Sequence, residues 1–242
     1  MKVIVAKDSM ELGKLASKQA TEAINKAIAE TGNARILLST GASQFTFFEH
    51  FVKEDIDWSK VEMFHLDEYV GISVDHPASF KKYLTERFIS KVNPAKYHLI
   101  DGQADPEKTI AELTALLNEK QVDVGLIGIG ENGHIAFNDP PVADFNDKAL
   151  VKPVKLDEIC RNQQVNDGCF AKIDDVPTHA LTLTVPALVK APYLFCIVPA
   201  PTKAWAVKET LTGSIDEHCP ASILRRQESA ILYLDKDSAS LL

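Results

Sequence analysis

Residues Val122–Ile129 (VDVGLIGI) set the fold class, because they are apolar apart from Asp123 and two glycines. A strand with one face in water alternates apolar and polar residues, whereas a strand covered on both faces, as in a parallel sheet, is apolar on successive positions. A glycine-rich polar segment, Gly130–His134 (GENGH), follows at once. The pattern predicts a buried parallel strand that runs directly into a loop carrying polar side chains.

Similar short apolar runs recur on both sides of this strand. We predict further strands at Lys2–Ala6, Arg35–Ser39, Val61–Leu66, Tyr97–Ile100, Ala180–Thr184, Tyr193–Val198 and Ala230–Leu234. Helical patterns lie between them, at residues 9–31, 43–53, 79–89, 106–119 and 202–212. Strands that alternate with helices predict an α/β fold with an open, mostly parallel Rossmann-like sheet, helices on both faces and right-handed crossovers.

Two local signals bound the first of these helices. Asp8 or Ser9 can cap its start, and Gly32 can end it. We see no internal repeat and no low-complexity linker, so residues 1–242 are predicted to form a single domain. Periodicity is weakest over Pro140–Gly168, which could be a loop, a lid or a small helical excursion.

The composition argues against several classes of partner. The net charge is −8 and the Lys and Arg residues are scattered, so nucleic acid and anionic membranes are poor candidates. No stretch approaches the ~20 apolar residues of a membrane span, and the first apolar run is too short for a secretory signal. The four cysteines show no CxxC spacing, which leaves little support for a structural zinc or redox motif. We expect a cytoplasmic protein with reduced thiols.

Polar segments follow three of the predicted strands directly, at Thr40–Gln44, Asp67–Gly71 and Gly128–Pro140. Ligands of open α/β sheets bind outside the carboxyl ends of the strands. We therefore expect these three segments to converge on one crevice.

The first segment, Ser39–Ser43 (STGAS), lies between a strand and a helix. A small-residue loop leaves backbone N–H groups exposed at the start of a helix, where the partial positive charge suits an anion such as phosphate. Thr40 and Ser43 add hydroxyl donors. The loop is not a Walker A motif, because no Gly-Lys-Ser/Thr follows, and a tight turn with a Ser N-cap is the alternative.

The second segment places two carboxylates, Asp67 and Glu68, side by side at a strand end. Mutual repulsion and partial burial would raise the pKa of one of them above the ~3.9 of a free Asp. Such a carboxylate suits proton abstraction from carbon. An exposed strand end with a helix-capping Asp is equally compatible with these residues.

The third segment has three glycines within the six residues Gly128–Gly133, followed by His134 among small and apolar residues. The glycines indicate unusual backbone angles or a close approach to a ligand. Asp139 could orient His134 as an acid–base pair, although a hydrogen-bonded core histidine is the alternative. The spacing fits neither a metal site nor a dinucleotide-binding turn, so we expect no metal and no nucleotide cofactor.

A fourth feature is Lys203, which follows the predicted strand Tyr193–Val198 at the start of a helix. A cation at this place could reach a phosphate. A solvated surface Lys is the alternative.

Taken together, these segments resemble the glucosamine-6-phosphate deaminase family along most of the chain. The most specific parts are Leu66–Gly71 (LDEYVG), His76–Phe80 (HPASF) and Asn132–Asn138 (NGHIAFN). Weaker similarities are Lys203-Ala204 and Pro220–Ser222 (PAS).

The resemblance implies conversion of an amino-sugar 6-phosphate to a ketose 6-phosphate and ammonia, without metal or cofactor. Asp67 would be the base that shuttles the C2 proton, and His134 would assist ring opening with Asp139 as its carboxylate partner. Asn132 falls where members of the family have Asp or Asn. The implied phosphate and substrate ligands are Thr40, Gly41, Ala42, Ser43, Glu68, Gly130 and Lys203.

The chain also departs from the family. Asp139 stands where relatives usually have Glu, and Asn166–Phe170 lacks an Arg that holds phosphate in many relatives, for which Arg161 could substitute. A Ser- and Arg-rich stretch that forms an allosteric site in some members is replaced by Pro141–Phe145 (PVADF). We predict no activation by an N-acetylated sugar phosphate.

Three other functions stay open at this point. A galactosamine-6-phosphate deaminase would differ only in the sugar epimer it accepts. A 6-phosphogluconolactonase-like hydrolase is less favoured, because those enzymes tend to have Asp-Glu-Arg where this chain has Asp67-Glu68-Tyr69. A non-catalytic sugar-phosphate sensor would normally need a DNA-binding module, and we see no basic helix-turn-helix segment.

Overall fold

The computed structural model describes residues 1–166 and 168–242, and its main sheet has seven strands in the order β1-β10-β9-β6-β2-β3-β5. Every neighbouring pair in this sheet is parallel. The strands are β1 (Lys2–Val5), β2 (Ala34–Leu38), β3 (Val61–His65), β5 (Lys96–His98), β6 (Val124–Ile127), β9 (Tyr193–Val198) and β10 (Ala230–Leu234). The predicted open parallel sheet is confirmed, with strand ends within two residues of those expected.

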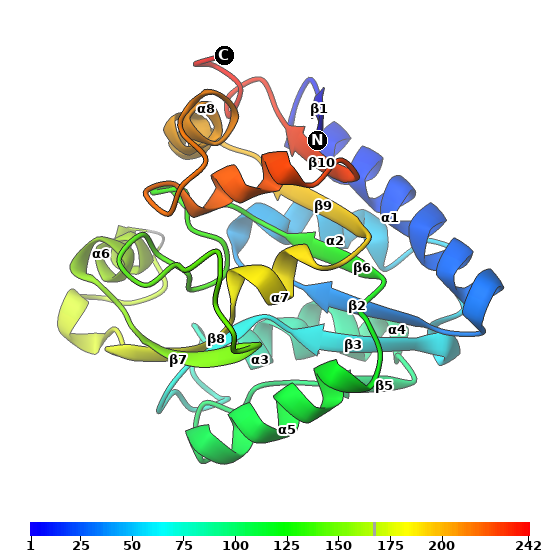
Figure 1. Ribbon diagram of the computed structural model, residues 1–242, viewed down its shortest axis with the longest axis horizontal. Helices are drawn as coiled ribbons and strands as arrows, with labels where there is room; N and C mark the ends of the chain where they lie inside the picture. Colours follow the sequence, from blue (N-terminus) through cyan, green and yellow to red (C-terminus); the bar gives the residue numbers. More distant parts are fainter. Residues whose placement is uncertain (167) are drawn as a thin grey trace.

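Helices cover both faces of this sheet (Figure 1). The described helices are α1 (Ser9–Thr31), α2 (Phe45–Phe51), α3 (Phe80–Leu84), α4 (Ser90–Val92), α5 (Pro106–Glu119), α6 (Glu158–Asn166), α7 (Val185–Val189) and α8 (Ala204–Thr212), of which α6 lies beside β7. A π-helical turn, Thr85–Ile89, joins α3 to α4. Asp8 caps α1 by accepting a hydrogen bond from the Glu11 amide, and Gly32 ends it in the left-handed conformation, as the sequence predicts.

The two faces of the sheet bury separate apolar clusters because side chains alternate along each strand. Ile36 and Leu38 of β2 pack with α1 and α2 on one face. Leu37, between them, packs on the other face with Leu188 of α7 and Val207 of α8. The main sheet is therefore a rigid platform, and its loops at the carboxyl ends of the strands carry the polar segments.

A second, antiparallel sheet, absent from the sequence prediction, contains β4 (Asp67–Tyr69), β8 (His179–Leu183) and β7 (Val151–Lys155), in the order β4-β8-β7. The strand predicted at Ala180–Thr184 exists as β8, but it pairs antiparallel with β4 and β7 and does not join the parallel sheet. The arrows of β2, β6 and β9 point toward the side of the molecule where β7, β8 and α6 lie (Figure 1).

The weakly periodic region Pro140–Gly168 contains β7 and α6, so it is neither a plain loop nor purely helical. Pro153 obscures the alternation of β7, and the polar sequence of α6 hides its helical period. Asp167, in the stretch predicted to lack the family's Arg, lies outside the described residues. Among the described helices, none combines the length and apolar character needed to cross a membrane.

Candidate active site

Asp67 is the first residue of β4, immediately beyond the carboxyl end of β3, and it is only 7% exposed. Burial raises the pKa of its carboxyl well above the ordinary value, and the nearby charges of Glu68 and Asp139 raise it further. The sequence predicts a raised pKa from carboxylate repulsion and partial burial, and in the structure burial is the larger of the two causes. A carboxylate that binds a proton this readily is suited to take one from carbon.

Glu68 is completely buried, and its carboxylate accepts hydrogen bonds from groups inside the protein. Its Oε2 accepts hydrogen bonds from the Ser79 hydroxyl (2.9 Å) and the Lys81 amide (2.8 Å), and its Oε1 accepts one from the Tyr69 amide (3.0 Å). Burial raises the pKa of Glu68, against the effect of these donors. These bonds give Glu68 a structural role at the start of α3, and its contact with substrate stays a prediction.

Two glycines shape the loop after β6. A Cβ atom on Gly130 would lie 2.1 Å from Cε1 of His134, so the imidazole occupies the space of the missing side chain. Gly133 has a φ of +85°, and a Cβ there would meet Sγ of Cys219 at 2.6 Å. Gly130 therefore seats the imidazole, and nothing in this arrangement requires it to touch a substrate.

Nδ1 of His134 lies within hydrogen-bond distance of two side-chain oxygen atoms. Nδ1 is 2.7 Å from Oδ1 of Asn132 and 3.0 Å from Oδ1 of Asp139, and Nδ2 of Asn132 donates to the same Asp139 oxygen at 2.8 Å. Both oxygens accept, so Nδ1 carries a proton and Nε2 is the nitrogen that can exchange one with a substrate. The structure thus places Asn132, His134 and Asp139 in one hydrogen-bonded cluster.

Asp139 has the opposite electrostatic setting from Asp67. Burial would raise the pKa of Asp139, but the charge of His134 and the hydrogen bonds from His134 and Asn132 lower it below its ordinary value. Its side chain is nearly fully buried, and the Cys160 thiol of α6 also bonds to it. Two neighbouring carboxyls with pKa values pushed apart are the usual sign of divided acid–base roles.

The Thr40–Ser43 loop adjoins the glycine-rich loop. A Cβ on Gly128 would be 3.6 Å from Oγ of Ser43, so the two loops are in contact. Gly41 has a φ of +102°, and its carbonyl accepts a hydrogen bond from the Tyr83 hydroxyl (2.9 Å). Ala42 begins the 3-10 turn Ala42–Gln44 that leads into α2, so its amide and that of Ser43 lie at the start of a helical segment.

Lys203 ends the 3-10 turn Pro201–Lys203, directly before α8 and beyond the carboxyl end of β9. Since β9 pairs with β6, Lys203 lies at the same edge of the sheet as the His134 loop. Arg161, the suggested substitute for the family's Arg, donates through Nη2 to the carbonyls of Ile173 (2.6 Å) and Val176 (3.0 Å). Its guanidinium therefore holds the 173–176 segment in this conformation.

Sequence reasoning left open a lid or a small helical excursion within Pro140–Gly168, and it missed that α6 packs beside Asp139. The Tyr69 hydroxyl donates to Oε1 of Gln164 (2.7 Å), and Cys160 is completely buried beside Asp139. The only sequence signal was a cysteine, Cys160, in an otherwise polar helix. Within the described residues, no group of three or more His, Cys, Asp or Glu side chains is arranged to hold a metal ion.

Comparisons with known proteins bear directly on this geometry. The family model described as glucosamine-6-phosphate isomerases/6-phosphogluconolactonase matches residues 7–233, which include every predicted site residue. The chain belongs to this family. A glucosamine-6-phosphate deaminase of Listeria innocua is 36% identical over 227 residues, covering 93% of this chain and 95% of the relative.

Two solved structures, one for each activity in the family's description, are similar to this chain. A structure described as a monomeric glucosamine-6-phosphate deaminase covers 100% of both chains with a TM-score of 0.89 and 29% identity. A 6-phosphogluconolactonase from Shewanella baltica covers 97% of both chains with a TM-score of 0.80 and 17% identity. At 17% identity this likeness shows a shared fold and carries no conclusion about activity.

Proposed function

We propose that the protein is a glucosamine-6-phosphate deaminase, an enzyme that converts glucosamine 6-phosphate to fructose 6-phosphate and ammonia. The observation that carries the proposal is the pair of buried carboxyls Asp67 and Asp139 in one site, with pKa values shifted in opposite directions. The reaction needs a base for a carbon-bound proton and a separate acid–base group for the ring. This site offers one group for each task.

The substrate's phosphate is held, in this proposal, by the amides of Ala42 and Ser43, the hydroxyls of Thr40 and Ser43, and Lys203. Backbone N–H groups at the start of a helical segment and one cation suit a dianion, even in a protein with a net charge of −8. Binding at this end fixes the sugar relative to Asp67 and His134.

Ring opening comes first. His134, with Nδ1 held by Asn132 and Asp139, moves a proton through Nε2 between the anomeric hydroxyl and the ring oxygen. The ionised Asp139 stabilises the imidazolium that forms when Nε2 gains a proton. Asp139 also fixes the orientation of the ring.

Asp67 then removes the C2 proton and returns it to C1. The electron pair left at C2 forms the double bond to C1 while the C1 carbonyl pair moves to O1, which takes up a proton from water. The proton delivered to C1 then shifts the double bond to the C2 nitrogen, and hydrolysis of the resulting iminium returns one proton to water. In this hydrolysis ammonia leaves and the C2 carbonyl of the ketose remains. The raised pKa of Asp67 makes it able to hold the proton between the two carbons.

The rival functions fit the site less well. Tyr69, which stands where lactonases tend to have Arg, is fully buried in an apolar cluster and bonded to Gln164, so no cation lies there. A sugar-phosphate sensor would need neither Asp67 nor the cluster around His134. A galactosamine-6-phosphate deaminase would use the same chemistry, and the two sugars must be compared directly.

The decisive experiment measures ammonia release from glucosamine 6-phosphate, with galactosamine 6-phosphate and 6-phosphogluconolactone run beside it. We expect rapid release from the glucosamine compound and loss of that activity in Asp67→Asn. Lactone hydrolysis without ammonia release would refute the proposal. Binding of the sugar phosphates without turnover would favour the sensor.

We further propose that the enzyme works as a single domain in the cytoplasm on a small amino-sugar phosphate, with no metal or cofactor. The cysteines Cys160, Cys169, Cys196 and Cys219 form no disulfide, which suits a reducing compartment. Activity that survives exhaustive treatment with a chelator would support the metal-free mechanism.

A further inference from the structure

The main sheet does not by itself bring Asp67 near His134. Asp67 follows β3 and His134 follows β6, and β2 lies between these two strands. Neighbouring strands are about 4.8 Å apart, so the carboxyl ends of β3 and β6 are separated by roughly 10 Å. A further element has to set the distance between the two groups.

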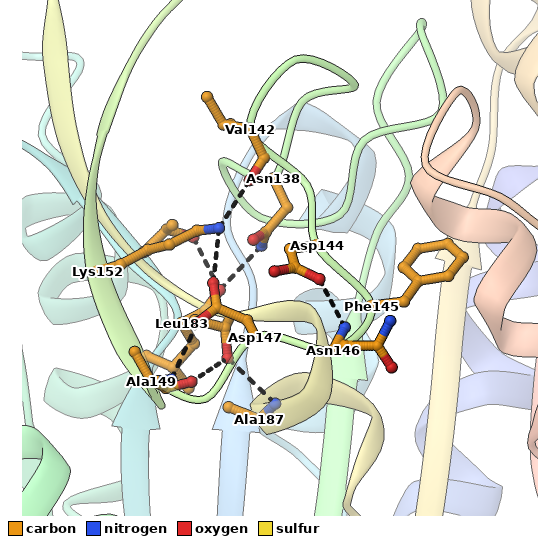
Figure 2. Close-up of polar contacts among 12 residues, drawn as sticks. Asn138, Val142, Asp144, Phe145, Asn146, Asp147, Ala149, Lys152, Leu183 and Ala187 are labelled. Carbon is orange, nitrogen blue, oxygen red and sulfur yellow. Dashed lines mark hydrogen bonds and ion pairs between the residues drawn. The ribbon is translucent and has the colours of Figure 1, made fainter.

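The second sheet supplies that element, since β8 contacts both segments. In the pairing of β4 with β8, Thr182 lies directly opposite Asp67. The loop after β6 bonds to the same stretch of β8, because the Phe137 amide donates to Oγ1 of Thr182 (3.1 Å) and Nδ2 of Asn138 donates to the Leu183 carbonyl (2.9 Å). Figure 2 shows the second of these bonds.

Both contacts are closed to solvent, because Thr182 and Asn138 are fully buried. The Thr182 hydroxyl has two partners, as it accepts from the Phe137 amide and donates to the Leu183 carbonyl (3.1 Å). A buried amide without an acceptor is strongly unfavourable, so the Phe137 amide holds its loop to Thr182. Asp139 is two residues beyond Phe137, and the same loop carries His134.

We propose that Thr182 is a positioning residue, whose hydroxyl holds the His134–Asp139 loop at its working distance from Asp67. The inference rests on the proposed deaminase function. Reacting groups that move by about 1 Å can lose on the order of 100-fold in rate. Loss of the hydroxyl therefore lowers turnover while the phosphate contacts, and with them substrate affinity, are kept.

The test compares Thr182→Val with Thr184→Val. Thr184 is an equally buried threonine just beyond β8, and its hydroxyl bonds to the Ala149 carbonyl (2.8 Å) and the Ala187 amide (3.4 Å), away from Asp67 and His134. Both variants lose a buried hydroxyl, so both should lower the midpoint of thermal unfolding. We expect kcat to fall at least tenfold in Thr182→Val alone, with KM within twofold of wild type.

The pH dependence of kcat/KM is a second readout, which a purely structural role of Thr182 would not change. The charge of Asp139 contributes to the raised pKa of Asp67, so a retreat of the loop lowers the pKa of Asp67. Because Asp67 must be ionised to act, the acid limb of kcat/KM shifts to lower pH in Thr182→Val and stays in place in Thr184→Val. Equal kcat losses in the two variants, or an unmoved acid limb in Thr182→Val, overturn the inference.

Two further variants keep the test sharp if Thr182→Val does not fold. Thr182→Ser keeps the hydroxyl and should retain most of kcat, whereas Thr182→Cys offers a weaker acceptor and should lose several-fold. Equal kcat in these two variants overturns the inference. An active wild type with an unaffected Thr182→Val variant refutes the role of Thr182 alone, while a wild type inactive on every amino-sugar phosphate refutes the proposed function as well.

Discussion

Asp67 shows how strongly a single residue in this site depends on burial. Its pKa is raised mainly because the carboxyl is removed from water, and its neighbours Glu68 and Asp139 add to the shift. Maintaining a charge at such a place opposes folding, so the residue on which the proposed chemistry depends also lowers stability.

Asp67→Asn should therefore abolish turnover, leave KM nearly unchanged and raise stability at neutral pH. For a group whose pKa is higher in the folded than in the unfolded state, stability is fully present at low pH and is lost as pH rises through the folded pKa. Asn mimics the protonated form, so the gain in the midpoint of thermal unfolding should be largest at neutral pH and shrink toward pH 4. A variant that turns over at the wild-type rate would exclude Asp67 as the base.

His134→Gln should slow the reaction less when the substrate is supplied as an open chain. Gln fills much of the same space but cannot exchange the proton that Nε2 moves during ring opening. Single-turnover rates with ring-closed and acyclic substrate analogues measure the difference. Equal losses with both forms would argue against a role in ring opening.

At the scale of elements, local sequence patterns predicted the main sheet well because each strand and helix carries its own signal. Val122–Ile129 was recognisable as a buried strand, and the ends of α1 were readable from Asp8 and Gly32. The second sheet had such a signal only at Ala180–Thr184, which predicted β8 without its partners. The strand β4 has three residues and pairs with β8, which comes from a distant part of the chain.

The same limit explains what was predicted of the site. Asp67, His134 and Asp139 could be singled out because each stands in a motif directly after a strand. The buried hydrogen bonds of Glu68 and the packing of α6 beside Asp139 could not be predicted. Both depend on contacts that the sequence around each residue does not reveal. Glu68 is used by the start of α3, and α6 reaches Asp139 through Cys160.

The position of α6 beside Asp139 leads to a prediction about how substrate reaches the site. Asp67 is only 7% exposed and Cys160 of α6 is completely buried beside Asp139, so we propose that α6 moves aside when substrate enters. In a Cys169→Ser background, alkylation of Cys160 should be slow and should become slower still with a bound substrate analogue. Mass spectrometry of the peptide containing Cys160 measures this, and alkylation that is fast and insensitive to ligand would contradict a closing role for α6.

At the scale of the molecule, the loop that follows Asp139 is braced by a side chain of β7. Nζ of Lys152 donates to the Val142 carbonyl (2.7 Å) and pairs with Oδ2 of Asp147 (2.9 Å), as Figure 2 shows. These two contacts tie the loop that follows Asp139 to β7.

We therefore expect no activation by an N-acetylated sugar phosphate. Initial rates plotted against glucosamine 6-phosphate should follow a hyperbola, and added N-acetylglucosamine 6-phosphate should leave the curve unchanged. Sigmoidal kinetics that the N-acetylated compound converts to a hyperbola would contradict this prediction. Asp147→Asn, which removes the charge paired with Lys152, serves as a comparison in which the loop is loosened.

The long sequence separation within the second sheet has a consequence for the order of events in refolding. Contacts between distant segments close large loops and form slowly, whereas β2, β3 and the helix between them are neighbours along the chain. Trp58 packs against Phe51 and Phe88 on the main sheet, so its fluorescence reports that part of the molecule. After dilution from denaturant, the fluorescence of Trp58 should recover first and catalytic activity only later, when β8 docks between its two partners.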